Sequence, residues 1–226
     1  MSGEDFDARF LEFERATHTF ELDAISYVPL EQLRKVLFYY DELRRLIDVP
    51  GDLVEFGVWR AATLCFLSDA SILLDGPNSS RSVIGFDTFA GFPPDTVFAR
   101  DRDRECRDIF RDTSREVVLR KIAVRPARRL QIVEGNIVET LPKHLAGWAN
   151  RIAMAICDAD TADVTRVILE NIWDRMAPGG CIYFDEYSRD GWSETDGVDA
   201  FFEARGFDRG RIKRVRGLPV ALVQVD

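Results

Sequence analysis

The chain contains few of the residues that carry nucleophilic or acid–base chemistry. It has two histidines, His18 and His144, and four cysteines with no CxxC pair among its 226 residues. Cys65, Cys157 and Cys181 lie in apolar runs and are predicted to be core residues. Residues 1–21 lack the apolar segment of a signal peptide, and no run is long enough to span a bilayer. We therefore expect a cytoplasmic protein with no membrane partner.

Two nucleotide-binding motifs and an excess of positive charge are also missing. The absence of GxGxxG disfavours a nicotinamide enzyme, and the absence of GxxxxGK[ST] excludes a P-loop enzyme on pattern. The 30 Lys and Arg residues are outnumbered by 39 Asp and Glu, which gives a net charge of −9 and argues against binding a phosphate backbone. No nucleic-acid partner is expected, and we interpret one basic cluster as a solvated helix face. That cluster consists of Arg120, Lys121, Arg125, Arg128 and Arg129.

The first 50 residues differ in pattern from the rest. Apolar residues from Leu30 to Ile47 recur at helical spacing, which predicts a helix with one wide apolar face. Four phenylalanines, from Phe6 to Phe20, lie among acidic residues before it. We interpret 1–50 as a helical cap whose first part acts as a lid and can contribute a subunit contact. We also expect the chain to form a homo-oligomer.

Residues 51–226 alternate between strand and helix patterns. Strands are predicted at 53–58, 82–86, 130–133, 152–157 and 181–184. Helices are predicted at 62–74, at 164–176 with a stop at Pro178-Gly179-Gly180, and at 198–204. Segments 211–215 and 220–225 predict a closing hairpin across Gly217. The sequence thus predicts a single Rossmann-like α/β domain with a mostly parallel seven-stranded sheet and a C-terminal antiparallel hairpin.

Each of the five predicted strands ends in or next to a carboxylate, where ligands bind on open α/β sheets. One carboxylate could be an ordinary cap, but five neighbouring acids repel and need a compensating cation. Gly57 would permit close approach of a nucleoside cofactor, and Asp87 would bind its ribose. Asp158, Asp185 and Glu186 could converge on a hard cation such as Mg²⁺ or Mn²⁺.

Five segments, in order, resemble the macrocin and mycinamicin sugar O-methyltransferase family. They are GDLVEFGVWRAATL, IGFDTFAGFP, EGNIVETLP, CDAD and PGGCIYFDEY, and the likeness runs from Gly51 to Gly206. The resemblance implies a class I fold that binds S-adenosylmethionine and Mg²⁺. By position, Asp158, Asp185 and Glu186 match the metal ligands. The residues assigned to the cofactor are Glu55, Gly57, Val58, Trp59, Asp87, Thr88, Gly135, Asn136 and Asp158.

The implied reaction is methylation of a small-molecule hydroxyl, on a sugar or another secondary-metabolite moiety. We assign Asp158 and Asp160 to catalysis, with Asp160 orienting the acceptor or taking its proton. Two departures from the family, Ala61-Ala62 and Thr161-Ala162-Asp163, bear on the first turn and the acceptor pocket. A catechol-type phenol methyltransferase and a non-catalytic binding protein of the same fold stay open as alternatives.

Overall fold

Seven strands form one sheet in the order β3-β2-β1-β4-β5-β7-β6. The computed structural model describes residues 28–76, 80–92, 110–124, 129–188 and 192–226. The strands β1 (Asp52–Phe56), β2 (Val83–Asp87), β3 (Leu130–Glu134), β4 (Ile152–Cys157) and β5 (Met176–Phe184) are parallel. The antiparallel strands β7 (Ala221–Gln224) and β6 (Lys213–Arg214) extend the β5 edge. The predicted mostly parallel sheet with a C-terminal hairpin is therefore confirmed.

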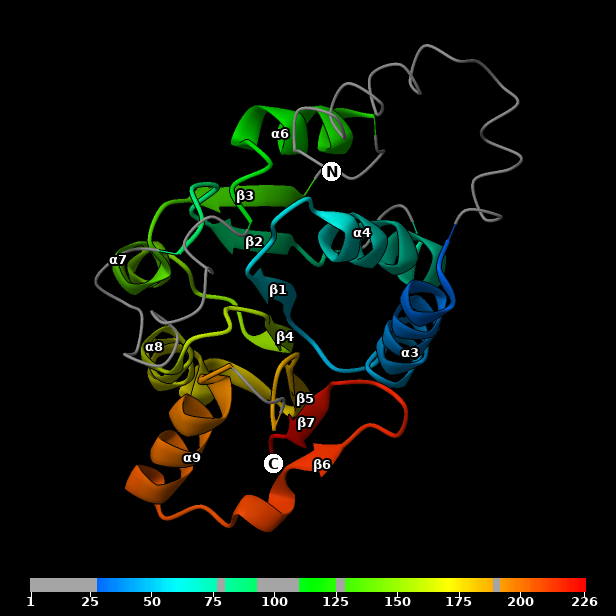
Figure 1. Ribbon diagram of the computed structural model, residues 1–226. Helices are drawn as coiled ribbons and strands as arrows, with labels where there is room; N and C mark the ends of the chain where they lie inside the picture. The colour runs from blue at the N-terminus through cyan, green and yellow to red at the C-terminus, as the bar shows by residue number, and fades with distance from the viewer. Residues whose placement is uncertain (1–27, 77–79, 93–109, 125–128, 189–191) are drawn as a thin grey trace.

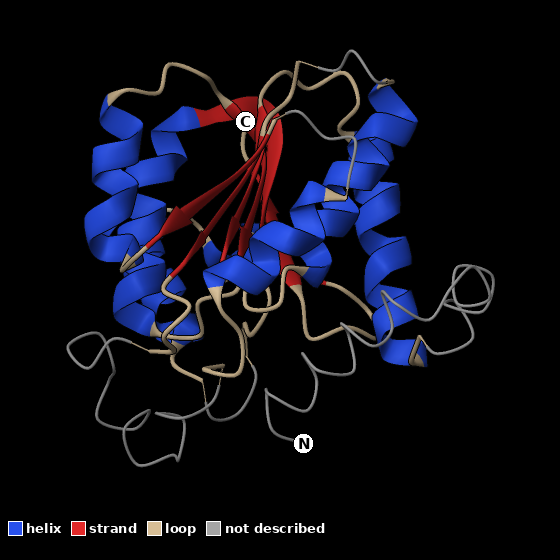
Figure 2. Ribbon diagram, turned by 90° about the horizontal axis from the view of Figure 1, so that it is seen from above, coloured by secondary structure: helices blue, strands red, loops and turns tan. Residues whose placement is uncertain are grey.

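Helices cover both faces of the sheet (Figure 2). The helices α3 (Leu30–Arg45), α4 (Ala62–Asp75) and α6 (Arg115–Ala123) bury Tyr39, Leu64 and Val118 in one core. The helices α7 (Ile137–Ala146), α8 (Ala162–Ile172) and α9 (Glu194–Arg205) pack on the other face, in a second core. Strand β4 is buried on both sides, because its side chains alternate between the two cores.

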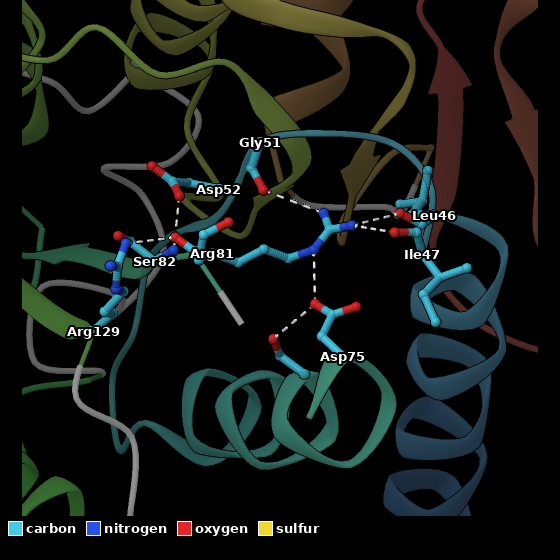
Figure 3. Close-up of polar contacts among 10 residues, drawn as sticks. Leu46, Ile47, Gly51, Asp52, Asp75, Arg81, Ser82 and Arg129 are labelled. Atoms are coloured by element: carbon cyan, nitrogen blue, oxygen red, sulfur yellow. Dashed lines mark hydrogen bonds and ion pairs between the residues drawn. The ribbon is translucent and has the colours of Figure 1, made fainter. Parts of the chain in front are cut away.

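Helix α3 lies beside α4 and is fastened at its C-terminal end by Arg81 (Figures 1 and 3). The Arg81 guanidinium donates to the carbonyl oxygens of Leu46 at 2.9 Å, Ile47 at 2.7 Å and Gly51 at 3.2 Å. It also forms an ion pair with Asp75 at 2.8 Å. Two of these bonds go to carbonyls directly after the last residue of α3, where the hydrogen bonds of the helix end. One side chain thus joins the ends of α3 and α4 to the start of β1.

The segment around Pro178 differs from the prediction. Helix α8 ends at Ile172, a 3₁₀ turn covers Trp173–Arg175, and β5 starts at Met176, before the Pro-Gly-Gly sequence. Gly179 adopts φ +83° and donates to the Val225 carbonyl at 2.8 Å, while Gly180 accepts from Val225 at 2.9 Å. The predicted helix stop is wrong, because the C-terminal end of the chain pairs with these glycines and makes them an irregular part of the strand.

The structure confirms the prediction for the cysteines and corrects the one for the basic cluster. Cys65, Cys157 and Cys181 are buried and unoxidised, as predicted. The basic cluster is not wholly solvated: Lys121 is buried and donates to the Arg60 carbonyl at 3.1 Å. None of the helices in the described ranges has the length and apolarity needed to cross a membrane. The predicted lid before Pro29 lies outside the described residues.

Candidate active site

A cleft opens at the carboxyl ends of β1, β2 and β4. Seven residues of the predicted site line it: Gly57, Trp59, Asp87, Thr88, Asn136, Asp158 and Asp160. Five other predicted residues lie outside the lining: Glu55, Val58, Gly135, Asp185 and Glu186. The sheet thus brings the polar ends of strands far apart in sequence to one cleft.

Asp87 fastens the loop that follows β1. One of its carboxylate oxygens accepts hydrogen bonds from the backbone N–H groups of Val58 and Trp59, both at 2.7 Å. The other oxygen accepts from the N–H of Phe89 at 2.7 Å. A carboxylate can accept about four hydrogen bonds. Three backbone donors therefore hold Asp87 in place and leave it the capacity for about one bond to a ligand.

Gly57 permits the close approach of β1 and β4. Its φ is +92°, and a Cβ there would lie 1.8 Å from the Asp158 carbonyl oxygen. No side chain fits at that separation, so the glycine is required for packing as well as for lining the cleft. On the far side, the Asn136 side chain caps α7 by accepting from Val138 N–H at 3.1 Å.

Backbone strain is concentrated around this cleft. Within the described ranges, six non-glycine residues have positive φ: Trp59, Ala61, Phe89, Phe110, Asp160 and Ser188. Five of them follow the ends of β1, β2, β4 and β5, and Trp59, Phe110 and Asp160 line the cleft. Such conformations cost free energy and collect at ligand-binding sites. Ala61 adopts φ +63° at the N-cap of α4, in the turn flagged as a departure.

A lysine from α3 lies in the acidic centre next to the cleft. The Lys35 ammonium is 2.9 Å from Asp185 Oδ1, 3.0 Å from its Oδ2 and 3.8 Å from Asp158 Oδ2. Burial, and next the neighbouring Asp185, raise the pKa of Asp158 to about 8, although the Lys35 ammonium acts to lower it. The sequence analysis does not include Lys35 in the site. The helical pattern around Lys35 gives no indication that its ammonium contacts a carboxylate 150 residues away.

Two more carboxyl groups are buried in the same region. Glu55 is 2% exposed and Glu194 is fully buried, and the second oxygen of each has no hydrogen-bond partner among the described residues. Burial raises the pKa of both groups, and Asp158 raises that of Glu55 further. Glu194 Oε1 accepts from the backbone N–H of Glu186 at 2.9 Å. Helix α9 thereby positions the residue that follows Asp185.

Aromatic side chains form one wall of the cleft. The rings of Trp59 and Phe92 each pack edge-on against Phe110, with centroids 5.4 Å and 5.8 Å apart. The Trp59 indole donates to Asp112 at 2.6 Å, and Trp192 lies 6.0 Å from Phe92. Phe89 does not line the cleft and is part of the core under α3 and α4.

The predicted metal ligands Asp158, Asp185 and Glu186 lie close together, but their carboxylates are not arranged as a coordination shell. Within the part of the chain that the structure describes, no three His, Cys, Asp or Glu side chains are placed to hold one ion. Asp185 and Glu186 are each 6% exposed, and Lys35 lies between Asp158 and Asp185. The ligand set therefore stays a prediction.

Comparison with known protein families identifies the family of this chain. The family model for macrocin O-methyltransferase matches residues 24–213. The chain belongs to this family. The resemblance seen in the sequence motifs is thus confirmed, and it extends through helix α3.

Curated relatives of the chain are named as O-methyltransferases of natural products. A tetracenomycin-C rhamnosyl 4′-O-methyltransferase of Streptomyces olivaceus is 31% identical over 148 residues, 63% of this chain and 55% of that protein. Mycinamicin III 3″-O-methyltransferase of Micromonospora griseorubida is 28% identical over 154 residues, 62% of this chain and 56% of that protein. The chain thus matches only about half the length of these curated relatives.

Solved structures agree on the fold. The calicheamicin methyltransferase CalS11 superposes with a TM-score of 0.75 at 25% identity, covering 98% of this chain and 91% of that one. The O-methyltransferase NovP gives 0.73 at 22% identity, covering 84% and 78%. An O-methyltransferase from Bacillus cereus, solved with S-adenosylhomocysteine, gives 0.56 at 14% identity and shares the fold.

Proposed function

We propose that the chain transfers a methyl group from S-adenosylmethionine to a hydroxyl of a small molecule, with the help of a divalent cation. The observation that carries this proposal is the cleft at the strand ends, in a chain that belongs to an O-methyltransferase family. The cofactor supplies an electrophilic methyl group. The protein's part is to orient the two reactants and to remove the hydroxyl proton.

The cofactor would lie along the cleft from Gly57 to Asn136. Asp87 retains the capacity for about one hydrogen bond after its three backbone bonds, which suits a ribose hydroxyl. Gly57 offers backbone with no side chain in the way, and Asn136 and Ile137 at the start of α7 line the opposite end. Glu55 lies buried beneath the cleft, near Asp87 and Asp158, and would support the cofactor site from below.

The acidic centre suits a hard divalent cation in its chemistry. Asp158, Asp185 and Glu186 would hold the ion by oxygen ligands from the ends of β4 and β5. That Asp158 and Asp185 already attract the Lys35 ammonium supports the assignment. A bound Mg²⁺ would lower the pKa of a coordinated hydroxyl. Asp160, strained and 5% exposed at the cleft, would orient the acceptor or accept its proton.

The acceptor we propose is a sugar hydroxyl on a secondary metabolite, because named relatives methylate such sugars. The aromatic wall of Trp59, Phe92 and Phe110 offers an apolar surface for the acceptor. We also propose that residues before Pro29 close over the acceptor and that the protein works as a cytoplasmic homo-oligomer.

Calorimetry with S-adenosylhomocysteine tests the cofactor site. We expect binding by the wild type and on the order of tenfold weaker binding by Asp87→Asn, because an amide group introduces a donor against three N–H groups. The control is Glu139→Gln, the same kind of change at an exposed site on α7. No heat with the wild type would defeat the methyltransferase proposal, whereas equal binding by Asp87→Asn would remove only the ribose role.

Transfer assays test the reaction itself. With S-adenosylmethionine, we expect methylation of sugar hydroxyls on secondary metabolites in preference to catechols, loss of activity in chelator and recovery with Mg²⁺ or Mn²⁺. Catechol preference would support the phenol methyltransferase alternative. Cofactor binding with no transfer to either class would support the binding-only alternative.

A further inference from the structure

The contacts of Lys35 place a positive charge where the proposed function needs a metal ion. Its ammonium lies within 3.0 Å of both Asp185 oxygens and 3.8 Å from Asp158. The side chains of Lys35 and Asp185 are 20% and 9% exposed, so solvent screens this pair only in part. The carboxyl group of Glu55 lies in the same surroundings.

The cap helix presents Lys35 on the face that packs against the sheet. Tyr39, one turn further along α3, is 1% exposed, and Glu42 accepts a hydrogen bond from the Tyr183 hydroxyl on β5. Residues three or four apart share a helix face, so packing of this face directs Lys35 toward the acidic centre. The neighbouring Arg34 lies on the exposed side and donates to the Gly217 carbonyl at 2.9 Å.

We infer that Lys35 is a resident counter-ion that takes the place of the divalent cation in the metal-free protein and is displaced when the cation binds. This inference rests on the metal site of the proposed function. A divalent ion held by Asp185 and Asp158 would sit within a few ångströms of the ammonium, since carboxylate–Mg²⁺ distances are about 2.1 Å. Two cations cannot share these oxygens without strong repulsion, so binding of one releases the other.

The displaced ammonium links the metal site to the cap. Without an ion, Lys35 relieves the repulsion between Asp158 and Asp185 and adds a tie between α3 and β5. With an ion, α3 keeps its other ties, including Glu42 to Tyr183 and Arg81 to the helix end. Lys35 is thus freed to face the neighbouring cleft and the acceptor, while the helix stays docked.

Titration of the metal-free protein with Mn²⁺, without cofactor or acceptor, tests this competition. We expect Lys35→Met to bind Mn²⁺ on the order of tenfold more tightly than wild type, because breaking a part-buried ion pair costs more than breaking an exposed one. Lys35→Arg keeps the charge and should stay close to wild type. Arg34→Met, which removes a charge from the adjacent exposed position, should also match wild type.

A second measurement uses the unaltered protein and so does not depend on folding of a variant. Reductive methylation of Lys35, followed by mass spectrometry, should speed up at saturating Mn²⁺, while Lys143, 77% exposed on α7, serves as the internal reference. If Mn²⁺ binds wild type and Lys35→Met equally and leaves the labelling of Lys35 unchanged, the counter-ion role is wrong and the metal site stands. If Mn²⁺ binds neither protein, both proposals fall.

Discussion

Gly57 is the residue at which two strand ends come closest together. Its backbone lies against the Asp158 carbonyl, so any side chain would force β1 away from β4 at the floor of the cleft. Gly57 has a positive φ. Among the described glycines, it is also the one at which an added Cβ would come closest to a neighbouring atom. A single glycine therefore serves the packing of the sheet and the shape of the site together.

We predict that Gly57→Ala destabilises the protein by about 3 kcal/mol and abolishes binding of S-adenosylhomocysteine, since it adds both strain and a backbone clash. Urea unfolding and calorimetry measure the two effects. The control is Gly206→Ala, which has left-handed φ +66° but nothing within 4 Å of the added Cβ. It should cost only about 1 kcal/mol. Equal losses for the two variants would show that conformation alone, without the clash, sets the cost at Gly57.

At the scale of elements, Arg81 determines how the cap helix meets the sheet. Its four contacts reach the last turn of α3, the end of α4 and the start of β1 (Figure 3). The Arg81 side chain is 12% exposed, so these are partly desolvated, charge-assisted hydrogen bonds. Placement of Lys35 and Tyr39 over the acidic centre depends on this anchoring of α3.

Arg81→Lys should lower the free energy of unfolding by about 2 kcal/mol, because an ammonium group cannot reach all four partners at once. Amide hydrogen exchange should become faster in α3 than in β1 or β4. Arg129→Lys is the matched control, since Arg129 makes one exposed contact, with the Ser80 carbonyl at 2.7 Å. Uniform acceleration of exchange across the sheet would instead mean that Arg81 supports the whole fold.

Some elements and site residues can be predicted from the sequence, whereas others depend on partners far along the chain. Strands β1 to β4 are predicted well, because each is a short apolar run that ends at Gly or Asp residues. The start of β5 is missed, because Pro-Gly-Gly usually ends a helix and its pairing with Val225 is decided 45 residues later. For the site, Gly57, Asp87 and Asp158 are found from their places at strand ends. Lys35 and the wall residue Phe110 are not, since their partners are distant in sequence.

For the whole molecule, buried acids make stability depend on pH. Burial and Asp158 raise the pKa of Glu55 above its usual value, so the folded state keeps a proton that the unfolded state loses. The free energy of unfolding therefore falls as pH rises above about 4.5, by at most about 1.4 kcal/mol per pH unit from this group. Glu194 and Asp158 contribute in the same direction.

We predict that Glu55→Gln removes part of this slope, because the amide keeps the shape of the side chain but does not titrate. Relative to wild type, the variant should gain stability steadily from pH 5 to pH 8 in urea unfolding. Glu139→Gln, at a side chain 68% exposed, should leave the pH profile unchanged. Parallel profiles for wild type and Glu55→Gln would show that Glu55 titrates normally in the folded state.

The ties between α3 and β5 also carry a consequence for biosynthesis. Lys35 and Glu42 bond to Asp185 and Tyr183, which follow them by 150 and 141 residues. At synthesis rates of about 5–20 residues per second, roughly seven to thirty seconds separate translation of the helix from translation of its partners. During that interval the apolar face of α3, with Tyr39 and Leu43, has no β5 to cover it. Nascent chains halted before β5 should therefore bind chaperones through this helix, and chains released after β7 should not.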